Sequence, residues 1–409
     1  MAKNRLAILH ALVLTFALPA FADEVGLGQS ALDQTRAAYR AAGPFQETLE
    51  IVVDLPGRPQ KRSRIDYGVA ASGASAFMAM WSDGQEFLRV VARDGRMVAI
   101  NPGQEGRYAQ TTHDHDFAAA LARLRADQAS LAAPASLVAA QGGDGAAFLE
   151  ALRLGALPPL EVAGSRPVVT EGQPPGIEIE LRGTDARLLL VVDGETQRLR
   201  SMSGQIGQGE YQARMTGNFH FTASEPGARL VLPDLANWKA LGTLAELESA
   251  GYPLGEPAPK LTIRSFAEDR DLQLDFPGAV VVLDFWATWC VPCWSALEHT
   301  QELAEWARTS GLPVRVFAVD TLEEVASLSE QREKVADFLK TRNLSLPVLL
   351  DFDRHAFAAF HRPGLPSLVI VGPDGRLARY YSGAIQDMVA TVKKEVLDLL
   401  GGHAAGGPP

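Results

Sequence analysis

The feature that most constrains this chain is a pair of cysteines placed directly after a run of apolar residues. The run, from Ala279 to Phe285, is apolar apart from one aspartate, which is typical of a strand covered on both faces of a sheet. Cys290 and Cys293 follow in the order Cys-Val-Pro-Cys, and the amphipathic segment from Cys293 to Thr309 predicts a helix. They are the only 2 cysteines among 409 residues. The two thiols therefore either form a redox pair or supply half of a metal site.

Thiol–disulfide exchange needs one thiolate that attacks and a second thiol that releases the mixed disulfide. At the start of a helix, unpaired N–H groups and the helix dipole lower the pKa of a thiol. We therefore expect Cys290 to attack and Cys293, almost one turn later and more buried, to resolve. Pro292 is tolerated in the first turn, where its missing N–H is not needed. Trp289 is expected to shield the sulfurs while leaving Cys290 approachable.

A zinc site is the alternative for the same two residues. It needs two further ligands, usually a second cysteine pair or two histidines. No third cysteine exists, and among His299, His355 and His361 only the last two are close in sequence. Trp294 follows Cys293 where attachment of c-type haem requires histidine. We expect no metal and no cofactor.

The first 22 residues are typical of a signal peptide. Lys3 and Arg5 precede an apolar run from Leu6 to Leu18, which is too short to span a bilayer, and an Ala-Phe-Ala cleavage site ends at Ala22. We expect cleavage after Ala22 and a periplasmic location; an uncleaved membrane anchor is the alternative. The net charge of −11 argues against a nucleic-acid partner.

Two domains are predicted after the signal peptide. Residues 23–235 predict an α+β domain, a curved antiparallel sheet with helices on one side, in which Asp94-Gly95 and Asp193-Gly194 mark hairpin turns. Residues 236–254 are expected to be a linker, because Gly and Pro cluster at its end. Residues 255–401 alternate strands and helices, which predicts an α/β domain. Residues 402–409 are rich in Gly, Ala and Pro and are expected to be a disordered tail.

The order of elements in the first domain resembles the LolA/LolB-like fold of lipoprotein carriers. It comprises an N-terminal helix, successive strands with a Ser-Asp-Gly hairpin, a central helical insert and further strands with an Asp-Gly turn. The resemblance implies an open half-barrel that holds acyl chains or apolar peptides. A plain interaction or spacer domain is the alternative.

The second domain resembles the thioredoxin superfamily, and most closely its exported TlpA/ResA-like branch. The segment from Phe285 to Cys293 is nearly the active-site signature of that superfamily. Gly255 to Leu261 is similar to the segment that begins the branch's domain. Gly364 to Ser367 and the turn Gly372 to Gly375 are similar to its cis-proline loop and hairpin. The resemblance implies a thioredoxin-like fold for residues 255–401.

Further site residues follow from this resemblance. Pro366 matches the proline whose preceding peptide bond is cis, which implies that the backbone of Leu365 pairs with a substrate strand. Asp284 matches the buried acid that helps to deprotonate the resolving Cys293, and burial raises the pKa of a carboxyl group. Trp289 matches the tryptophan before the first cysteine, so it is expected to contact substrate.

The sequence thus predicts an exported thiol–disulfide oxidoreductase that exchanges disulfides with envelope proteins, acting as a reductant. Because the chain has no other cysteine, its electrons are expected from a membrane thiol donor in trans. One departure from the TlpA/ResA-like branch is Ala296, where that branch usually has Glu; proton handling is then expected to rest on Asp284. An oxidase is one alternative. The other is a lipid- or apolar-peptide-binding protein whose thioredoxin domain only docks.

Overall fold

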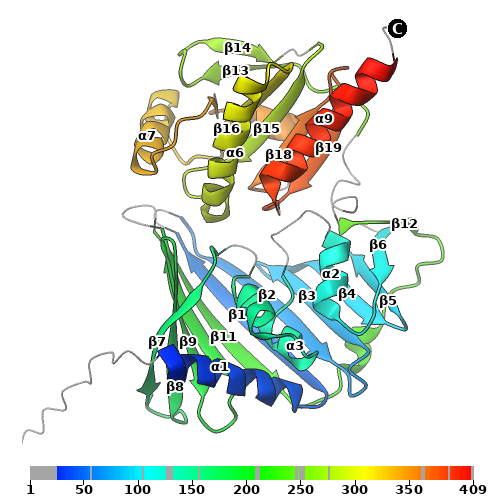
Figure 1. The fold of residues 1–409 in the computed structure, drawn as a ribbon, viewed down its shortest axis with the longest axis vertical. Coiled ribbons are helices and arrows are strands. Elements are labelled where there is room, and N and C mark those ends of the chain that lie inside the picture. Colours follow the sequence, from blue (N-terminus) through cyan, green and yellow to red (C-terminus); the bar gives the residue numbers. More distant parts are fainter. Residues whose placement is uncertain are drawn as a thin grey trace, which may run out of the picture.

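The computed structural model describes residues 25–55, 58–103, 106–125, 132–154, 157–207, 212–244, 247, 254–274, 277–360, 364–385 and 387–406. Its named strands form one sheet of 12 strands in the first half of the chain and one of 7 strands in the second (Figure 1). The predicted signal peptide and its cleavage site lie outside the described residues. No helix in the described ranges is both long and apolar enough to cross a membrane.

The N-terminal sheet is curved and, apart from one edge, antiparallel (Figure 1). Its order is β12-β6-β5-β4-β3-β2-β1-β11-β10-β9-β8-β7, and only the β12–β6 pair is parallel. The strands are β1 (Phe45–Asp54), β2 (Lys61–Val69), β3 (Ala76–Ser82), β4 (Gln85–Arg93), β5 (Arg96–Ile100), β6 (Arg107–Thr112), β7 (Glu161–Val168), β8 (Gly176–Gly183), β9 (Ala186–Asp193), β10 (Leu199–Ile206), β11 (Ala213–Thr222) and β12 (Lys239–Leu241).

The hairpin turns follow from residues that tolerate positive φ. Asp94 and Gly95 join β4 to β5 with φ of 52° and 75°, as a tight two-residue turn requires. The predicted turn at Asp83-Gly84 has the same signs of φ. The α+β class predicted for this domain is confirmed, whereas the likeness to LolA/LolB stays a prediction.

Among the described residues, the helices that pack on this sheet include α1 (Val25–Arg40), α2 (Phe117–Arg125), α3 (Ala135–Ala140) and α4 (Gly145–Leu152). Helix α2 begins with an N-cap, since Asp116 Oδ1 accepts a hydrogen bond from the N–H of Ala119 at 2.9 Å. Leu32, Leu137 and Phe148 are fully or almost fully buried in the shared core. The helices therefore cover the sheet with their own apolar side chains.

A buried carboxyl group ties the helices to the sheet. Glu47 on β1 accepts hydrogen bonds from the hydroxyls of Tyr39 on α1 at 2.8 Å and Tyr67 on β2 at 2.6 Å. The hydroxyl of Ser136 on α3 donates a third at 2.5 Å. Burial raises the pKa of Glu47, and these donors partly offset the rise. The side chain of Glu47 thus joins α1, β2 and α3 to β1.

The segment predicted as a linker contributes to the first domain. Its strand β12 pairs with β6, and Leu244 and Leu247 are 1% exposed within the N-terminal core. The leucines of this segment form an apolar face that packs on the first domain. The linker prediction relied on the Gly and Pro residues at the end of the segment and did not take this face into account. At the other end of the chain, the helix that closes the second domain continues to Gly406, where a tail was predicted from residue 402.

The C-terminal sheet has the order β14-β13-β17-β16-β15-β18-β19. Its strands are β13 (Leu261–Ser265), β14 (Asp271–Leu274), β15 (Val280–Trp286), β16 (Val314–Thr321), β17 (Val348–Asp351), β18 (Ser367–Val371) and β19 (Leu377–Ser382). Its helices are α6 (Val291–Ser310), α7 (Leu328–Thr341), α8 (His355–Ala359) and α9 (Met388–Gly406). The predicted α/β class is confirmed.

Strand β15 is the spine of this domain. It pairs with β16 in parallel and with β18 antiparallel, and all of its residues are buried. Because side chains alternate along a strand, Leu283 and Phe285 pack on the α8 side, whereas Val282 packs with α6 and α9 on the other. Asp284 therefore points to the face that α6 covers.

Candidate redox site

The two cysteines lie where β15 passes into α6. Cys290 caps α6 with an extended backbone (φ −83°, ψ 91°), and Pro292 sits in the first turn as expected. Cys290 and Cys293 are joined by a disulfide with 5.3 Å between their Cα atoms. Cys290 is 3% exposed and Cys293 is 0% exposed. Both cysteines are therefore buried, although Trp289 was expected to leave Cys290 approachable.

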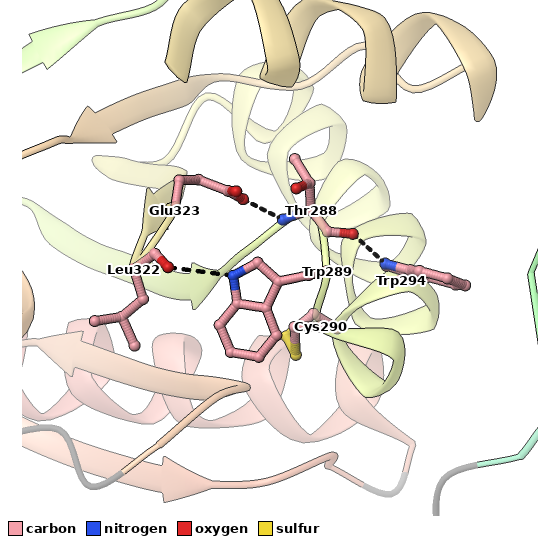
Figure 2. The surroundings of a disulfide bond; sticks show 7 residues. Thr288, Trp289, Cys290, Trp294, Leu322 and Glu323 are labelled. Atoms are coloured by element: carbon pink, nitrogen blue, oxygen red, sulfur yellow. Dashed lines mark hydrogen bonds between the residues drawn. A yellow bond between two sulfur atoms is a disulfide. The ribbon is translucent and has the colours of Figure 1, made fainter. Parts of the chain in front are cut away.

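Three hydrogen bonds hold the loop that precedes the disulfide (Figure 2). The N–H of Thr288 donates to Glu323 Oε1 at 2.6 Å, and the carbonyl of Thr288 accepts from the indole N–H of Trp294 at 2.9 Å. The indole N–H of Trp289 donates to the carbonyl of Leu322 at 3.2 Å. The loop is thus fixed on one side by α6 and on the other by the segment after β16.

Leu322 adopts a backbone conformation that side chains disfavour. Its φ is 58°, in the left-handed region, which costs a non-glycine residue about 1–2 kcal/mol. The carbonyl of Leu322 faces the indole of Trp289 in this arrangement (Figure 2). The strain is therefore located at a residue that holds the redox loop.

Two buried acidic residues, Asp320 and Glu323, lie at the end of β16 and just after it. Glu323, whose side chain is 1% exposed, forms an ion pair with Lys334 Nζ at 2.7 Å. Asp320, at the register position opposite Trp286, accepts a hydrogen bond from Gln331 at 2.7 Å. Burial first, and then the neighbouring charge of Glu323, raise the pKa of Asp320 well above its usual value. Sequence reasoning missed both acids, although Asp320 stands at the end of an apolar strand just as Asp284 does.

Asp284 lies behind the cysteine pair. Its carboxyl accepts a hydrogen bond from the hydroxyl of Thr300 at 2.6 Å. Thr300 lies two turns after Cys293 on the same face of α6, so Cys293 and Asp284 share one side of the sheet. Burial raises the pKa of Asp284 from 3.8 to about 7, and the Thr300 hydroxyl opposes the rise. A carboxyl group with this pKa can both take up and release a proton near neutral pH.

The loop before β18 borders the disulfide. The peptide bond between Leu365 and Pro366 is cis, as the resemblance implied. Leu365 is half-buried and packs against the cluster that contains Cys290 and Cys293. Trp289 packs against the same cluster and is also half-buried. The structure thus brings all six predicted site residues to one end of the domain; their roles stay predictions.

The metal alternative has little to draw on. Among the residues that the structure describes, no group of three or more His, Cys, Asp or Glu side chains is placed to hold a metal ion. His361, one of the histidines considered from the sequence, lies outside those residues. The two sulfurs are bonded to each other, so the observed chemistry of the pair is that of a disulfide.

The C-terminal domain is similar to known thiol-disulfide oxidoreductases and thioredoxin-like proteins. Residues 254–380 match the model of the AhpC/TSA family. The thiol-disulfide oxidoreductase ResA of Bacillus subtilis (strain 168) is 26% identical over 133 residues, which cover 32% of this chain and 69% of that protein. The thioredoxin-like protein YneN of the same organism is 28% identical over 123 residues, covering 30% and 67%.

Solved structures give a partial overlap with the same region. StoA of Bacillus subtilis covers 34% of this chain and 96% of its own, at 20% identity and a TM-score of 0.29. A putative thiol:disulfide interchange protein DsbE of Chlorobium tepidum covers 36% and 97%, at 22% identity and a TM-score of 0.31.

The C-terminal part of this chain therefore has a thioredoxin-like domain, which matches the AhpC/TSA family model over residues 254–380. The class that the domain and its paired cysteines define is a protein-disulfide oxidoreductase. Within that class, the curated relatives that it resembles include the ResA proteins.

Proposed function

We propose that this protein reduces disulfide bonds of other exported proteins at Cys290 and Cys293. The observation that carries the proposal is the disulfide at the start of α6, between the chain's only cysteines. Unpaired N–H groups at a helix start favour a thiolate at Cys290, which is needed for attack. The ResA relatives carry the name of thiol-disulfide oxidoreductases, which supports the same reaction here.

The reaction proceeds in two exchanges. The Cys290 thiolate attacks one sulfur of the substrate disulfide, which forms a mixed disulfide and expels the other substrate sulfur as a thiolate. Cys293, once deprotonated, attacks the Cys290 sulfur and releases the second substrate thiolate. Two electrons pass to the substrate, and Cys290 and Cys293 end as a disulfide.

Asp284 handles the proton of the second exchange. Its pKa of about 7 lets the carboxylate accept the proton of the Cys293 thiol, directly or through a bridging water. The Thr300 hydroxyl stabilises the charged carboxylate by its hydrogen bond. This arrangement supplies an acid–base group in a chain that has Ala296 where the TlpA/ResA-like branch usually has Glu.

The residues between the cysteines support the reducing direction. A pair becomes strongly oxidising when its reduced thiolate form is specially stabilised. Val291 and Pro292 carry no charge, and proline offers no N–H to a thiolate. They therefore give Cys290 no extra stabilisation beyond the helix start.

The location and the partners belong to the same proposal. The signal-peptide pattern, with cleavage after Ala22, supports a periplasmic protein. After one turnover both thiols are oxidised and the chain holds no other cysteine. A dithiol in trans must therefore restore them, and we assign this role to a thiol donor of the membrane. No observation on the described residues favours the lipid-carrier alternative.

Insulin reduction tests the activity. The reduced wild-type protein should reduce insulin and precipitate its B chain, whereas Cys290→Ser should be inactive and Cys293→Ser should stop after the first exchange. A Cys290→Ser variant that still reduces insulin would falsify the proposal. Equilibration with glutathione tests the direction: a potential of about −270 mV indicates a reductant, and one of about −120 mV an oxidant.

A further inference from the structure

Described residues beside the ends of three strands of the N-terminal sheet lie against the redox end of the second domain. The strands are β1, β8 and β10, and strand register places these ends at one edge, since Asp54 lies opposite Arg214 and Ile206 opposite Ala186. The end of α6 that carries the cysteines points toward this edge (Figure 1). We call Arg58, Asp185 and Ile206, one residue from each end, the hairpin rim.

Arg58 makes the most direct contact with the redox loop. Its guanidinium carbon lies 3.8 Å from the centroid of the Trp289 ring, within range of a cation–π interaction. Its Nη2 donates to the carbonyl of Leu322 at 2.8 Å, and its Nη1 lies 3.1 Å from Glu324 Oε1. The side chain of Arg58 is only 16% exposed. One residue of the first domain thus covers the residue next to Cys290.

The carbonyl of Leu322 joins the two domains. It accepts from the indole of Trp289 and from Arg58, so both donors depend on the left-handed backbone of this residue. The same strained position that holds the redox loop therefore also receives the N-terminal domain.

The other two residues of the hairpin rim, Ile206 and Asp185, contact the redox end of the second domain as well. Ile206 packs against the apolar cluster that contains Cys290 and Cys293. Asp185 Oδ2 lies 3.9 Å from Nη1 of Arg342, whose guanidinium carbon in turn lies 4.2 Å from the ring centroid of Trp294. Apolar, charged and stacking contacts thus come from three separate hairpins.

Exchange requires another sulfur to approach Cys290, yet Cys290 is 3% exposed in this arrangement. We propose that Arg58 is a specificity-determining residue of the redox site: it holds the hairpin rim over Cys290, which admits small or unfolded disulfide substrates and excludes bulky folded ones until the rim opens. The selection among substrates rests on the proposed function. The contact between Arg58 and the redox loop does not depend on that function.

The size of the effect follows from the contacts that are lost. Removing a cation–π contact together with a buried hydrogen bond shifts the balance between closed and open forms about tenfold. Bulky reagents need the open form, whereas small ones also reach Cys290 in the closed form. The ratio of the bulky-reagent rate to the small-reagent rate therefore measures how often the hairpin rim is open.

The test uses the full chain in its reduced form with Cys293→Ala, which leaves Cys290 as the one thiol. N-ethylmaleimide is the small probe, and a maleimide carrying a polyethylene glycol chain is the bulky one. Arg58→Ala should raise the bulky-to-small rate ratio about tenfold. Arg62→Ala, which removes an exposed arginine of the same hairpin, is the matched control and should leave the ratio unchanged.

An equal rate ratio in Arg58→Ala and Arg62→Ala would overturn the inference. If both rates of Arg58→Ala also change by the same factor, Arg58 acts on the charge of the thiolate rather than on access to it. Arg58→Lys keeps the charge but loses the planar fork, so it should also raise the ratio, and it provides the test if Arg58→Ala does not fold.

Alkylation needs no turnover, so this test is separate from the proposed function. A parent protein that fails to reduce insulin but shows the Arg58 effect refutes the function and leaves the rim in place. A parent that reduces insulin with no Arg58 effect refutes the rim alone.

Discussion

Replacing Asp284 with asparagine should change how the stability of the protein depends on pH. The buried carboxyl has a pKa of about 7 in the folded protein against a usual 3.8, so the folded state binds its proton more tightly than the unfolded state. Stability from this group is therefore full at low pH and falls as pH rises from about 4 to about 7. Asparagine keeps the shape but has no proton to lose.

The magnitude follows from the shift itself. A change from 3.8 to about 7 corresponds to about 4 kcal/mol, all of it lost above pH 7. Between pH 5 and pH 8, the part still to be lost is about 2–3 kcal/mol. The free energy of unfolding of Asp284→Asn, relative to that of the wild type, should rise by this amount over the same interval.

Urea unfolding of the oxidised proteins, followed by tryptophan fluorescence, measures the difference. Trp286, Trp289, Trp294 and Trp306 all belong to the second domain, so the signal reports mainly on the part that holds Asp284. A difference between variant and wild type that stays constant from pH 5 to pH 8 would refute the titration of this carboxyl near neutral pH.

Three further substitutions test other buried groups. Thr300→Val removes the hydrogen bond that lowers the pKa of Asp284, so the pH midpoint of the unfolding difference should move up by about one pH unit; no upward movement contradicts the contact. Glu323→Gln removes a negative charge beside the buried Asp320 at the end of β16. The pKa of Asp320 should therefore fall, which the pH dependence of its carboxyl carbon NMR shift measures. An unchanged pKa there would show that the two carboxyls do not interact. Tyr67→Phe removes one donor to Glu47 and should destabilise the first domain by about 1–3 kcal/mol in urea unfolding monitored by circular dichroism, whereas a loss below about 0.5 kcal/mol would mean that the other donors suffice.

Local sequence patterns predicted those turns and strands whose own residue types favour that structure. Turns such as Asp94-Gly95 and the apolar strand before Cys290 follow from backbone preference and burial. Strand β2 was not predicted, because its burial does not alternate: Lys61 and Arg62 at its start are exposed, whereas its last five residues are all buried. Strand β12 was not predicted either, since its pairing with β6 joins residues far apart in sequence.

The candidate site divides in the same way. Cys290, Cys293 and Asp284 lie within one strand–helix junction, so their spacing alone brings them together. Glu323 reaches the redox loop only because β16 lies beside β15. Arg58 comes from 264 positions before Leu322, and no local pattern could place it there.

Trapping of a mixed disulfide tests the central claim most directly. Reduced Cys293→Ser, mixed with insulin and quenched with acid, should accumulate a covalent adduct that mass spectrometry locates at Cys290. Cys290→Ser under the same conditions should form none. An adduct at Cys293 in the Cys290→Ser variant at an equal rate, or no adduct at Cys290 in the Cys293→Ser variant, would contradict the assignment of Cys290 as the attacking thiol.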